Sequence, residues 1–169
     1  ETGLESQVGV GSTFWFTARL EAGQTTIGDE TPVLSAPERS IRRHHAGARI
    51  LLVEDDAMNQ EIACELLKET GLHVDIAENG RQAVTKAVST NYALILMDMQ
   101  MPEMGGLEAT AIIRSLPHHQ DTPIIAMTAN AFDEDRQRCL RTGMSDFVAK
   151  PVDPDLLFTT LARWLPPSG

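Results

Sequence analysis

Five side chains suited to phosphoryl or metal chemistry stand at or just after the ends of apolar segments: Glu54, Asp55, Asp98, Thr128 and Lys150. Carboxylates that lie close together repel one another and raise one another's pKa, which is costly unless a cation shares the site. Magnesium binds oxygen ligands and usually combines one or two carboxylates with a phosphate oxygen. The residue types therefore predict a magnesium site open to a phosphoryl donor, with Lys150 and Thr128 contacting the phosphoryl oxygens.

These side chains can meet only if the segments before them are neighbouring strands of one sheet. From Ala48 onward, short β-branched or Leu-rich runs alternate with amphipathic stretches, which predicts an α/β domain of five strand–helix repeats around a parallel sheet. The predicted strands are Arg49–Val53, His73–Ala77, Ala93–Met97, Pro123–Met127 and Asp146–Ala149. The predicted helices are Ala57–Thr70, Arg81–Ser89, Leu107–Leu116, Asp133–Arg141 and Asp153–Leu165. In an open parallel sheet, ligands collect at the carboxyl ends of the strands, so this edge is the predicted site.

Two segments precede this domain, which we place at residues 48–169. Residues 1–21 contain a Gly turn and an expected strand within Gly9–Leu20, and one strand cannot fold alone. Residues 22–47 combine Gly, Ser, Thr and Pro without a sustained apolar period, which is typical of a flexible linker. The chain starts at Glu1 without an initiator Met or a signal peptide, and we interpret it as a piece of a longer protein.

Composition narrows the possible partners. The 169 residues carry a formal net charge of −10, which opposes nucleic-acid binding by the surface as a whole. No apolar run approaches the ~20 residues that span a bilayer, so we expect no membrane contact by this fragment. Cys64 and Cys139 lack metal-ligand spacing and are expected to be free thiols. A reducing cytoplasm fits this usage, while the parent protein could still be membrane-anchored.

Four sequence blocks resemble those of response-regulator receiver domains, and they occur in the family's order: Ile50–Asp55, Leu96–Pro102, Met127–Ala129 and Phe147–Pro151. The resemblance covers about Ala48 to Leu165. It implies a flavodoxin-like (βα)5 fold, a doubly wound parallel five-stranded sheet with strand order 2-1-3-4-5.

The resemblance also implies roles for the acidic residues. Asp98 would be the nucleophile that takes a phosphoryl group from a phosphohistidine and becomes an acyl phosphate. Magnesium would be bound by Glu54, Asp55, Asp98 and the backbone carbonyl of Gln100. Lys150 would bind a phosphoryl oxygen and stabilise the charge that builds up during transfer. Asp56, beside the acidic pair, is expected to be the N-cap of the next helix.

Further residues match the positions that, in this family, control the conformational switch and the hydrolysis of the acyl phosphate. Thr128 and Phe147 would form a coupled switch, in which the hydroxyl moves to the phosphoryl group and the ring turns inward. Gln100 and Asn130 would flank the incoming water and tune the lifetime of the acyl phosphate. The Lys150–Pro151 peptide bond would be cis. Such a domain catalyses its own phosphorylation and dephosphorylation.

The opening segment extends the resemblance to a parent protein. Gly9–Phe16 resembles the closing motif and last strand of a histidine-kinase ATP-binding domain, so residues 1–21 would be the remnant of that domain. The parent would then be a hybrid sensor histidine kinase. Its receiver would take the phosphoryl group from the kinase core and pass it to a separate histidine phosphotransfer protein.

Three other readings compete with this one. A receiver-fold module that binds proteins without being phosphorylated would not need the complete set of acids, Thr128 and Lys150. A small-molecule phosphohydrolase would need a second Asp two residues after Asp98, where Gln100 stands. A nucleotide switch would need a Gly-rich loop ending in Gly-Lys-Ser/Thr.

Four histidines occur as adjacent pairs in segments predicted to be linker or loop, and their side chains are expected to be solvated: His44, His45, His118 and His119.

Overall fold

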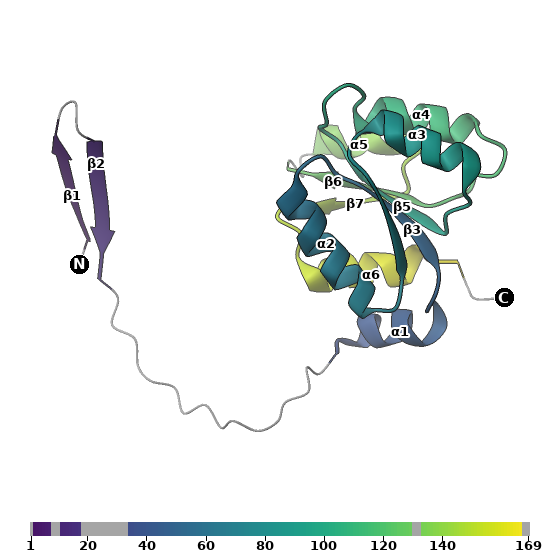
Figure 1. The fold of residues 1–169 in the computed structure, drawn as a ribbon, viewed down its shortest axis with the longest axis horizontal. Helices are drawn as coiled ribbons and strands as arrows, with labels where there is room; N and C mark the ends of the chain where they lie inside the picture. Colours follow the sequence, from purple (N-terminus) through teal and green to yellow (C-terminus); the bar gives the residue numbers. More distant parts are fainter. Residues whose placement is uncertain (1, 8–10, 18–33, 130–132, 167–169) are drawn as a thin grey trace. The chain divides into compact units, whose positions relative to one another are not determined.

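The computed structural model describes residues 2–7, 11–17, 34–129 and 133–166. The chain divides into two units, Glu1–Val33 and Leu34–Gly169 (Figure 1). In the first unit, strand β1 (Thr2–Gln7) pairs antiparallel with strand β2 (Gly11–Phe16). The strand expected in this segment is therefore present as β2, and the sequence analysis missed its partner β1.

The second unit is built on a five-stranded parallel sheet, as expected. Its strands are β3 (Arg49–Val53), β4 (His73–Ala77), β5 (Leu94–Asp98), β6 (Ile124–Thr128) and β7 (Asp146–Ala149). Their order in the sheet is β4-β3-β5-β6-β7, and all neighbouring pairs are parallel. Numbered from the first strand of the sheet, this order is 2-1-3-4-5, and the predicted flavodoxin-like topology is confirmed.

Two layers of helices cover the sheet (Figure 1). The helices are α1 (Ala36–His44), α2 (Ala57–Glu69), α3 (Gly80–Ser89), α4 (Gly106–Ser115), α5 (Asp133–Arg141) and α6 (Pro154–Trp164). Successive side chains of β3 point to opposite faces, so Ile50 and Leu52 pack with α2 and α6, whereas Leu51 and Val53 pack with α3 and α4. Because both faces are covered, this strand is apolar and buried from Ile50 to Val53.

Every strand and helix predicted from Arg49 onward is present, with bounds that agree within one residue. Two of the small shifts bear on the site. Strands β5 and β6 each extend one residue further than expected, so Asp98 and Thr128 are the last residues of strands. Asp98 lies opposite Met127 in the register of β5 and β6. The ends of these strands thus fix the backbone of both residues.

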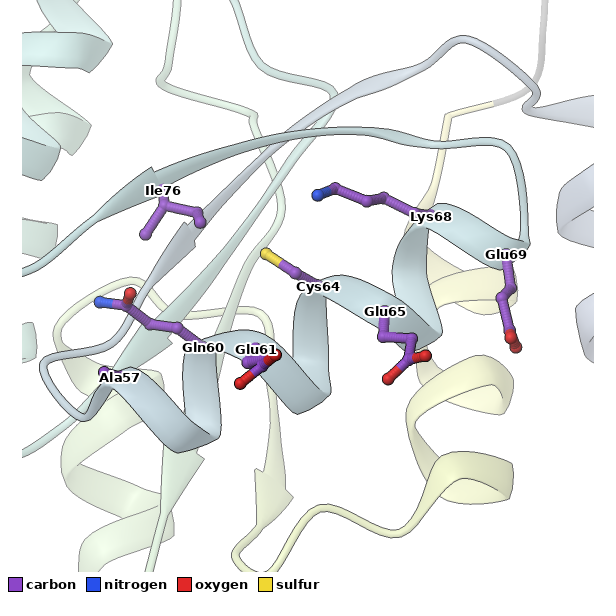
Figure 2. A pocket seen from close by; sticks show the side chains of 8 residues that line it. All are labelled: Ala57, Gln60, Glu61, Cys64, Glu65, Lys68, Glu69 and Ile76. Carbon is purple, nitrogen blue, oxygen red and sulfur yellow. The ribbon is translucent and has the colours of Figure 1, made fainter.

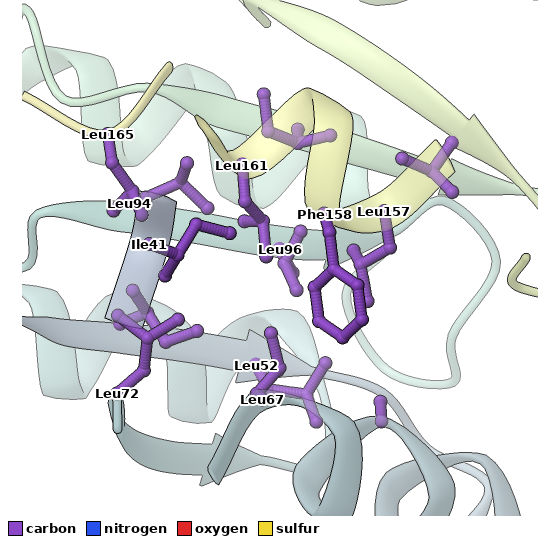
Figure 3. Packing of buried hydrophobic residues seen from close by; sticks show 14 of the residues in the cluster. Ile41, Leu52, Leu67, Leu72, Leu94, Leu96, Leu157, Phe158, Leu161 and Leu165 are labelled. Carbon is purple, nitrogen blue, oxygen red and sulfur yellow. The ribbon is translucent and has the colours of Figure 1, made fainter. Parts of the chain in front are cut away.

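Helix α1 corrects the expected extent of the linker. Ser35 and Glu38 form a capping box at its start, with Pro37 in the first turn. Its Ile41 is fully buried in the core cluster beneath α2 and α6, and Figure 3 shows it among Leu94, Leu161 and Leu165. The linker predicted over residues 22–47 is therefore wrong for residues 34–47, which belong to the second unit. Residues 18–33 lie outside the described residues.

Candidate functional site

Four of the five strands end at a residue of the predicted site or just before one. Asp98 and Thr128 close β5 and β6, while Glu54 and Lys150 come directly after β3 and β7. Because the strands are parallel, their carboxyl ends form one rim. The fold therefore brings together, at that rim, side chains that lie up to 96 residues apart in the sequence, from Glu54 to Lys150.

Lys150 lies between two buried carboxylates. Its Nζ is 2.6 Å from Asp98 Oδ2 and also 2.6 Å from Glu54 Oε2. The side chains of Glu54 and Asp98 are only 2% and 7% exposed. Burial by itself would lower the pKa of Lys150, but its hydrogen bonds to Asp98 and Glu54 and their charges outweigh burial and raise it. The lysine is therefore held as an ammonium ion, and the next peptide bond, Lys150–Pro151, is cis.

Three carboxylates form a compact group beside this ammonium. One oxygen each from Glu54, Asp55 and Asp98 can lie within 4.8 Å of the other two. Glu54 and Asp98 are buried, whereas Asp55 is exposed. One exposed and two buried carboxylates, all offering oxygen, fit a hard divalent ion that keeps part of its water. These residues can hold magnesium.

Amide groups orient the two buried acids. Asn59 Nδ2 donates to Glu54 Oε1 at 3.1 Å, and Gln60 Nε2 donates to the backbone carbonyl of Glu54 at 2.6 Å. The backbone N–H of Gln100 donates to Asp98 Oδ1 at 3.1 Å. Asp98 therefore uses one oxygen for Gln100 and the other for Lys150. Sequence reasoning missed Asn59 and Gln60, although two amides in the first turn after an acidic pair were a usable signal.

The turn between β3 and α2 is fixed by Asp56. Its Oδ1 accepts a hydrogen bond from the backbone N–H of Asn59 at 2.9 Å, so Asp56 is the N-cap of α2, as expected. This cap sets the first turn of the helix, from which Asn59 and Gln60 reach Glu54. Asp56 is thus not among the predicted metal ligands, but it positions Asn59 and Gln60, which hydrogen-bond to Glu54.

Thr128 and Phe147 lie on neighbouring strands. Thr128 is buried, and Phe147 is half-buried against the core on the α3–α4 side. In the register of β6 and β7, Phe147 lies opposite Ala126, so Phe147 and Thr128 point to the same face of the sheet. The guanidinium of Arg136 lies 5.3 Å from the centre of the Phe147 ring. Asn130 lies outside the described residues.

Comparison with known proteins shows the family to which the chain belongs. The family model of the response regulator receiver domain matches residues 50–162. The chain belongs to this family. Within it, the receiver is 41% identical over 120 residues to the signal transduction histidine-protein kinase BarA of Escherichia coli K12. That match covers 71% of the chain but spans only 13% of the length of the kinase.

Two solved structures resemble the receiver closely. The receiver domain of sensor histidine kinase PA1611 from Pseudomonas aeruginosa PAO1 has a magnesium ion in its active-site cleft; it is 42% identical, with a TM-score of 0.67, over 71% of this chain and 98% of that one. The receiver of Saccharomyces cerevisiae Ssk1, crystallised with the histidine phosphotransfer protein Ypd1, is 28% identical, with a TM-score of 0.67, over 71% and 90%. The fold and the family are thus established.

Outside the rim, one expectation about histidines is wrong. His119 is fully buried rather than solvated. Its Nε2 lies 3.0 Å from the carbonyl oxygens of both Ala87 and Thr90, and its Nδ1 lies 2.9 Å from Thr122 Oγ1. Because carbonyls only accept, Nε2 carries the proton, and His119 joins the end of α3 to the loop before β6. Cys64 and Cys139 are both buried, and neither forms a disulfide bond.

A small cavity of about 200 Å³ adjoins the rim. Its lining combines polar side chains of the site with apolar residues of α2, of β6 and of the segment after β7. Its lining comprises Glu54, Asn59, Ile62, Ala63, Met127, Lys150, Pro151 and Val152. Among the described residues, no helix is long and apolar enough to cross a membrane.

Proposed function

We propose that this receiver accepts a phosphoryl group from a phosphohistidine onto Asp98. The contact between Lys150 Nζ and Asp98 Oδ2, at 2.6 Å and with Glu54 equally close, is the observation that carries the proposal. A carboxylate oxygen of Asp98 forms the bond to phosphorus, and the bond from phosphorus to the imidazole nitrogen breaks. The product is an acyl phosphate on Asp98 and a histidine that regains its proton.

Lys150 and Thr128 complete the transfer site. When Asp98 gives one oxygen to phosphorus, the ammonium of Lys150 is free to bind a phosphoryl oxygen while it remains paired with Glu54. The Thr128 hydroxyl, at the end of the neighbouring strand, would move to another phosphoryl oxygen, and the Phe147 ring would follow it inward. This coupled movement would report phosphorylation at the surface.

Glu54, Asp55, Asp98 and the backbone carbonyl of Gln100 would hold a magnesium ion. The carboxylate group described above supports this assignment, as does the magnesium in the related PA1611 receiver. The bound ion would offset charge on the phosphoryl oxygens during transfer. Gln100 and Asn130 would tune the lifetime of the acyl phosphate by their position beside the attacking water.

The partners follow from the phosphorelay. We assign the donor to the kinase core of a hybrid sensor histidine kinase in the cytoplasm, with residues 1–21 as the remnant of its ATP-binding domain, and the acceptor to a histidine phosphotransfer protein. The Ypd1 complex of the related Ssk1 receiver supports the second partner. Met58 and Ile62 on α2 are 70% and 51% exposed beside the cavity at the rim, and they offer an apolar contact for a helix that carries the histidine.

Mass spectrometry after incubation with acetyl phosphate and magnesium tests the proposal. We expect a single phosphoryl adduct on the unaltered chain and none on the Asp98→Asn variant. The adduct should also require magnesium and should form faster with a phosphorylated kinase core. An unaltered chain that takes up no phosphoryl group from either donor would instead favour the protein-binding module. Turnover of many equivalents of a phosphate ester would favour a phosphohydrolase.

A further inference from the structure

Helix α1 carries a surface that none of the roles above uses. It lies outside residues 50–162, which the receiver family model matches. Its apolar side is occupied, because Ile41 is fully buried in the core. Its other side exposes Arg39, Arg42 and Arg43. In the part of the chain that the structure describes, these three arginines form no ion pair.

A row of opposite charge runs along α2. Glu61, Glu65 and Glu69 are exposed, and they too form no ion pair with a described residue. They border a groove of about 730 Å³ between α2 and strand β4. Figure 2 shows Cys64 and Lys68 on the side of the helix that faces Ile76, whereas the carboxylates of Glu65 and Glu69 point away from it. The acidic row thus lies along the outer edge of the groove.

The two rows match in spacing as well as in charge. Residues four apart on a helix lie on one side, about 6 Å from one another along the axis. Arg39 and Arg43 have this spacing on α1, and so do successive members of the glutamate row on α2. No described ion pair joins α1 to α2 within one copy. Between two copies, the arginine row of one can face the glutamate row of the other at matching spacing.

We propose that the chain associates with itself head to tail, through the arginine face of α1 on one copy and the glutamate row of α2 on another. The two surfaces differ, so each added copy leaves one of each kind free, and the assembly grows or closes into a ring. Exposed ion pairs are weak and are screened by salt, and the net charge of −10 opposes close approach. Association should therefore occur at high protein concentration and at an ionic strength low enough to leave these ion pairs unscreened.

Sedimentation velocity on the full 169-residue chain tests this surface. The weight-average mass should rise with protein concentration at low ionic strength and return to the monomer in about 1 M salt, where the Debye length is about 3 Å. Two double variants each neutralise two residues of one row, four positions apart: Arg39→Gln with Arg43→Gln, and Glu61→Gln with Glu65→Gln. Each should stay monomeric alone. An equimolar mixture should form species of two copies and no larger, because only one complementary pair of surfaces remains.

The matched control places the same charge change on another helix. Arg138→Gln with Arg141→Gln on α5 should associate as the unaltered chain does. Circular dichroism checks that every variant is folded, and Asp98→Asn should leave the association unchanged, which separates this inference from the proposed phosphorylation. A monomeric unaltered chain at low salt, a mixture that stays monomeric, or a row variant that still associates alone would each overturn it.

Discussion

Lys150 supplies positive charge between the two buried carboxylates of the rim. It pairs with two carboxylates that are almost wholly buried. Removing one partner of a buried ion pair leaves uncompensated charge, whereas removing the whole group can cost little. The loss of this lysine should therefore affect stability, apart from its proposed role in phosphoryl transfer.

Replacing Lys150 with Met should lower the free energy of unfolding at pH 7 by about 3 kcal/mol, because Glu54 and Asp98 would then face each other without a cation. Urea denaturation measures the change. Magnesium should recover part of the loss, because a divalent ion would replace the missing positive charge. A variant as stable as the unaltered chain at pH 7 would show that the lysine does not compensate the two acids.

His119 gives the fold a dependence on pH. Burial lowers its pKa, and the charges of His118 and Arg114 lower it further against the hydrogen bonds to Thr90 and Ala87, which raise it. The folded chain therefore binds this proton less readily than the unfolded chain does. The stability from neutral His119 is complete above the ordinary value of 6.5 and is lost as the pH falls through the lowered pKa.

The histidine variant His119→Gln should remove this dependence. Unfolding free energies measured between pH 7.5 and pH 5 should fall more steeply for the unaltered chain than for the variant. His73→Gln, at an exposed position, is the control and should follow the unaltered chain. Parallel curves for His119→Gln and the unaltered chain would mean that His119 is not held neutral by the fold.

At the scale of elements, the first residue of α4 has no room for a side chain. A Cβ at Gly106 would collide with the backbone carbonyl of Asp98, and its next neighbour would be the Met97 side chain at 3.0 Å. Helix α4 thus begins directly against the end of β5. Any atom added there must move the helix or the end of the strand that carries Asp98.

Gly106→Ala should therefore destabilise the chain by about 1–3 kcal/mol, as overpacking does, and should slow phosphorylation by acetyl phosphate. Gly105→Ala is the matched control, because a Cβ there would meet only the Met99 carbonyl oxygen, at 3.4 Å. Thermal unfolding and the rate of adduct formation measure both effects. Equal behaviour of the two variants would contradict the close packing of α4 on β5.

Helix α1 should prove to be part of the receiver unit. Ile41→Ala should lower the free energy of unfolding by about 2–5 kcal/mol, because it leaves a cavity in the core. Arg42→Ala, exposed on the same helix, should change it by less than about 0.5 kcal/mol. Likewise, a chain that starts at Leu34 should keep the melting temperature of the full chain, and one that starts at Ala48 should lose several degrees.

The sequence predicts the elements from Arg49 onward because their apolar runs are periodic and Gly or Pro residues end them. Helix α1 escaped prediction because only Ile41 of its residues is apolar, large and buried, so it has no sustained apolar period. Strand β1 was not predicted because its pairing with β2, rather than its own composition, makes it a strand. Both misses are elements whose stability comes from a neighbour and leaves little trace in their own residues.

For the whole molecule, magnesium binding at the rim should raise the free energy of unfolding. An ion that binds only the folded chain stabilises it by about 2.7 kcal/mol when its concentration is about 100 times Kd. Magnesium should therefore raise the melting temperature, and EDTA should reverse the rise. Asp55→Asn should abolish the response, whereas Asp56→Asn should retain it, because an asparagine can still cap α2. A response in Asp55→Asn equal to that of the unaltered chain would place the ion elsewhere.

The site was more predictable than its supports. A resemblance in four blocks identified the acids and Lys150, and the order of the strands explains why they meet at one rim. Asn59 and Gln60 were missed because their role depends on the cap of α2, which fixes where their amides point. His119 was misjudged because two adjacent histidines in a loop resemble a solvated pair until α3 is placed beside them.

The packing of α1 against α6 has a consequence for how the receiver is built into a larger chain. Helix α1 leads to the amino end of β3, and α6 runs from the rim back to the same end of the sheet, where the imidazole of His45 meets the carbonyl of Pro166. The chain therefore enters and leaves this unit at the pole opposite Asp98. A tether attached on either side would leave the rim with Asp98 uncovered.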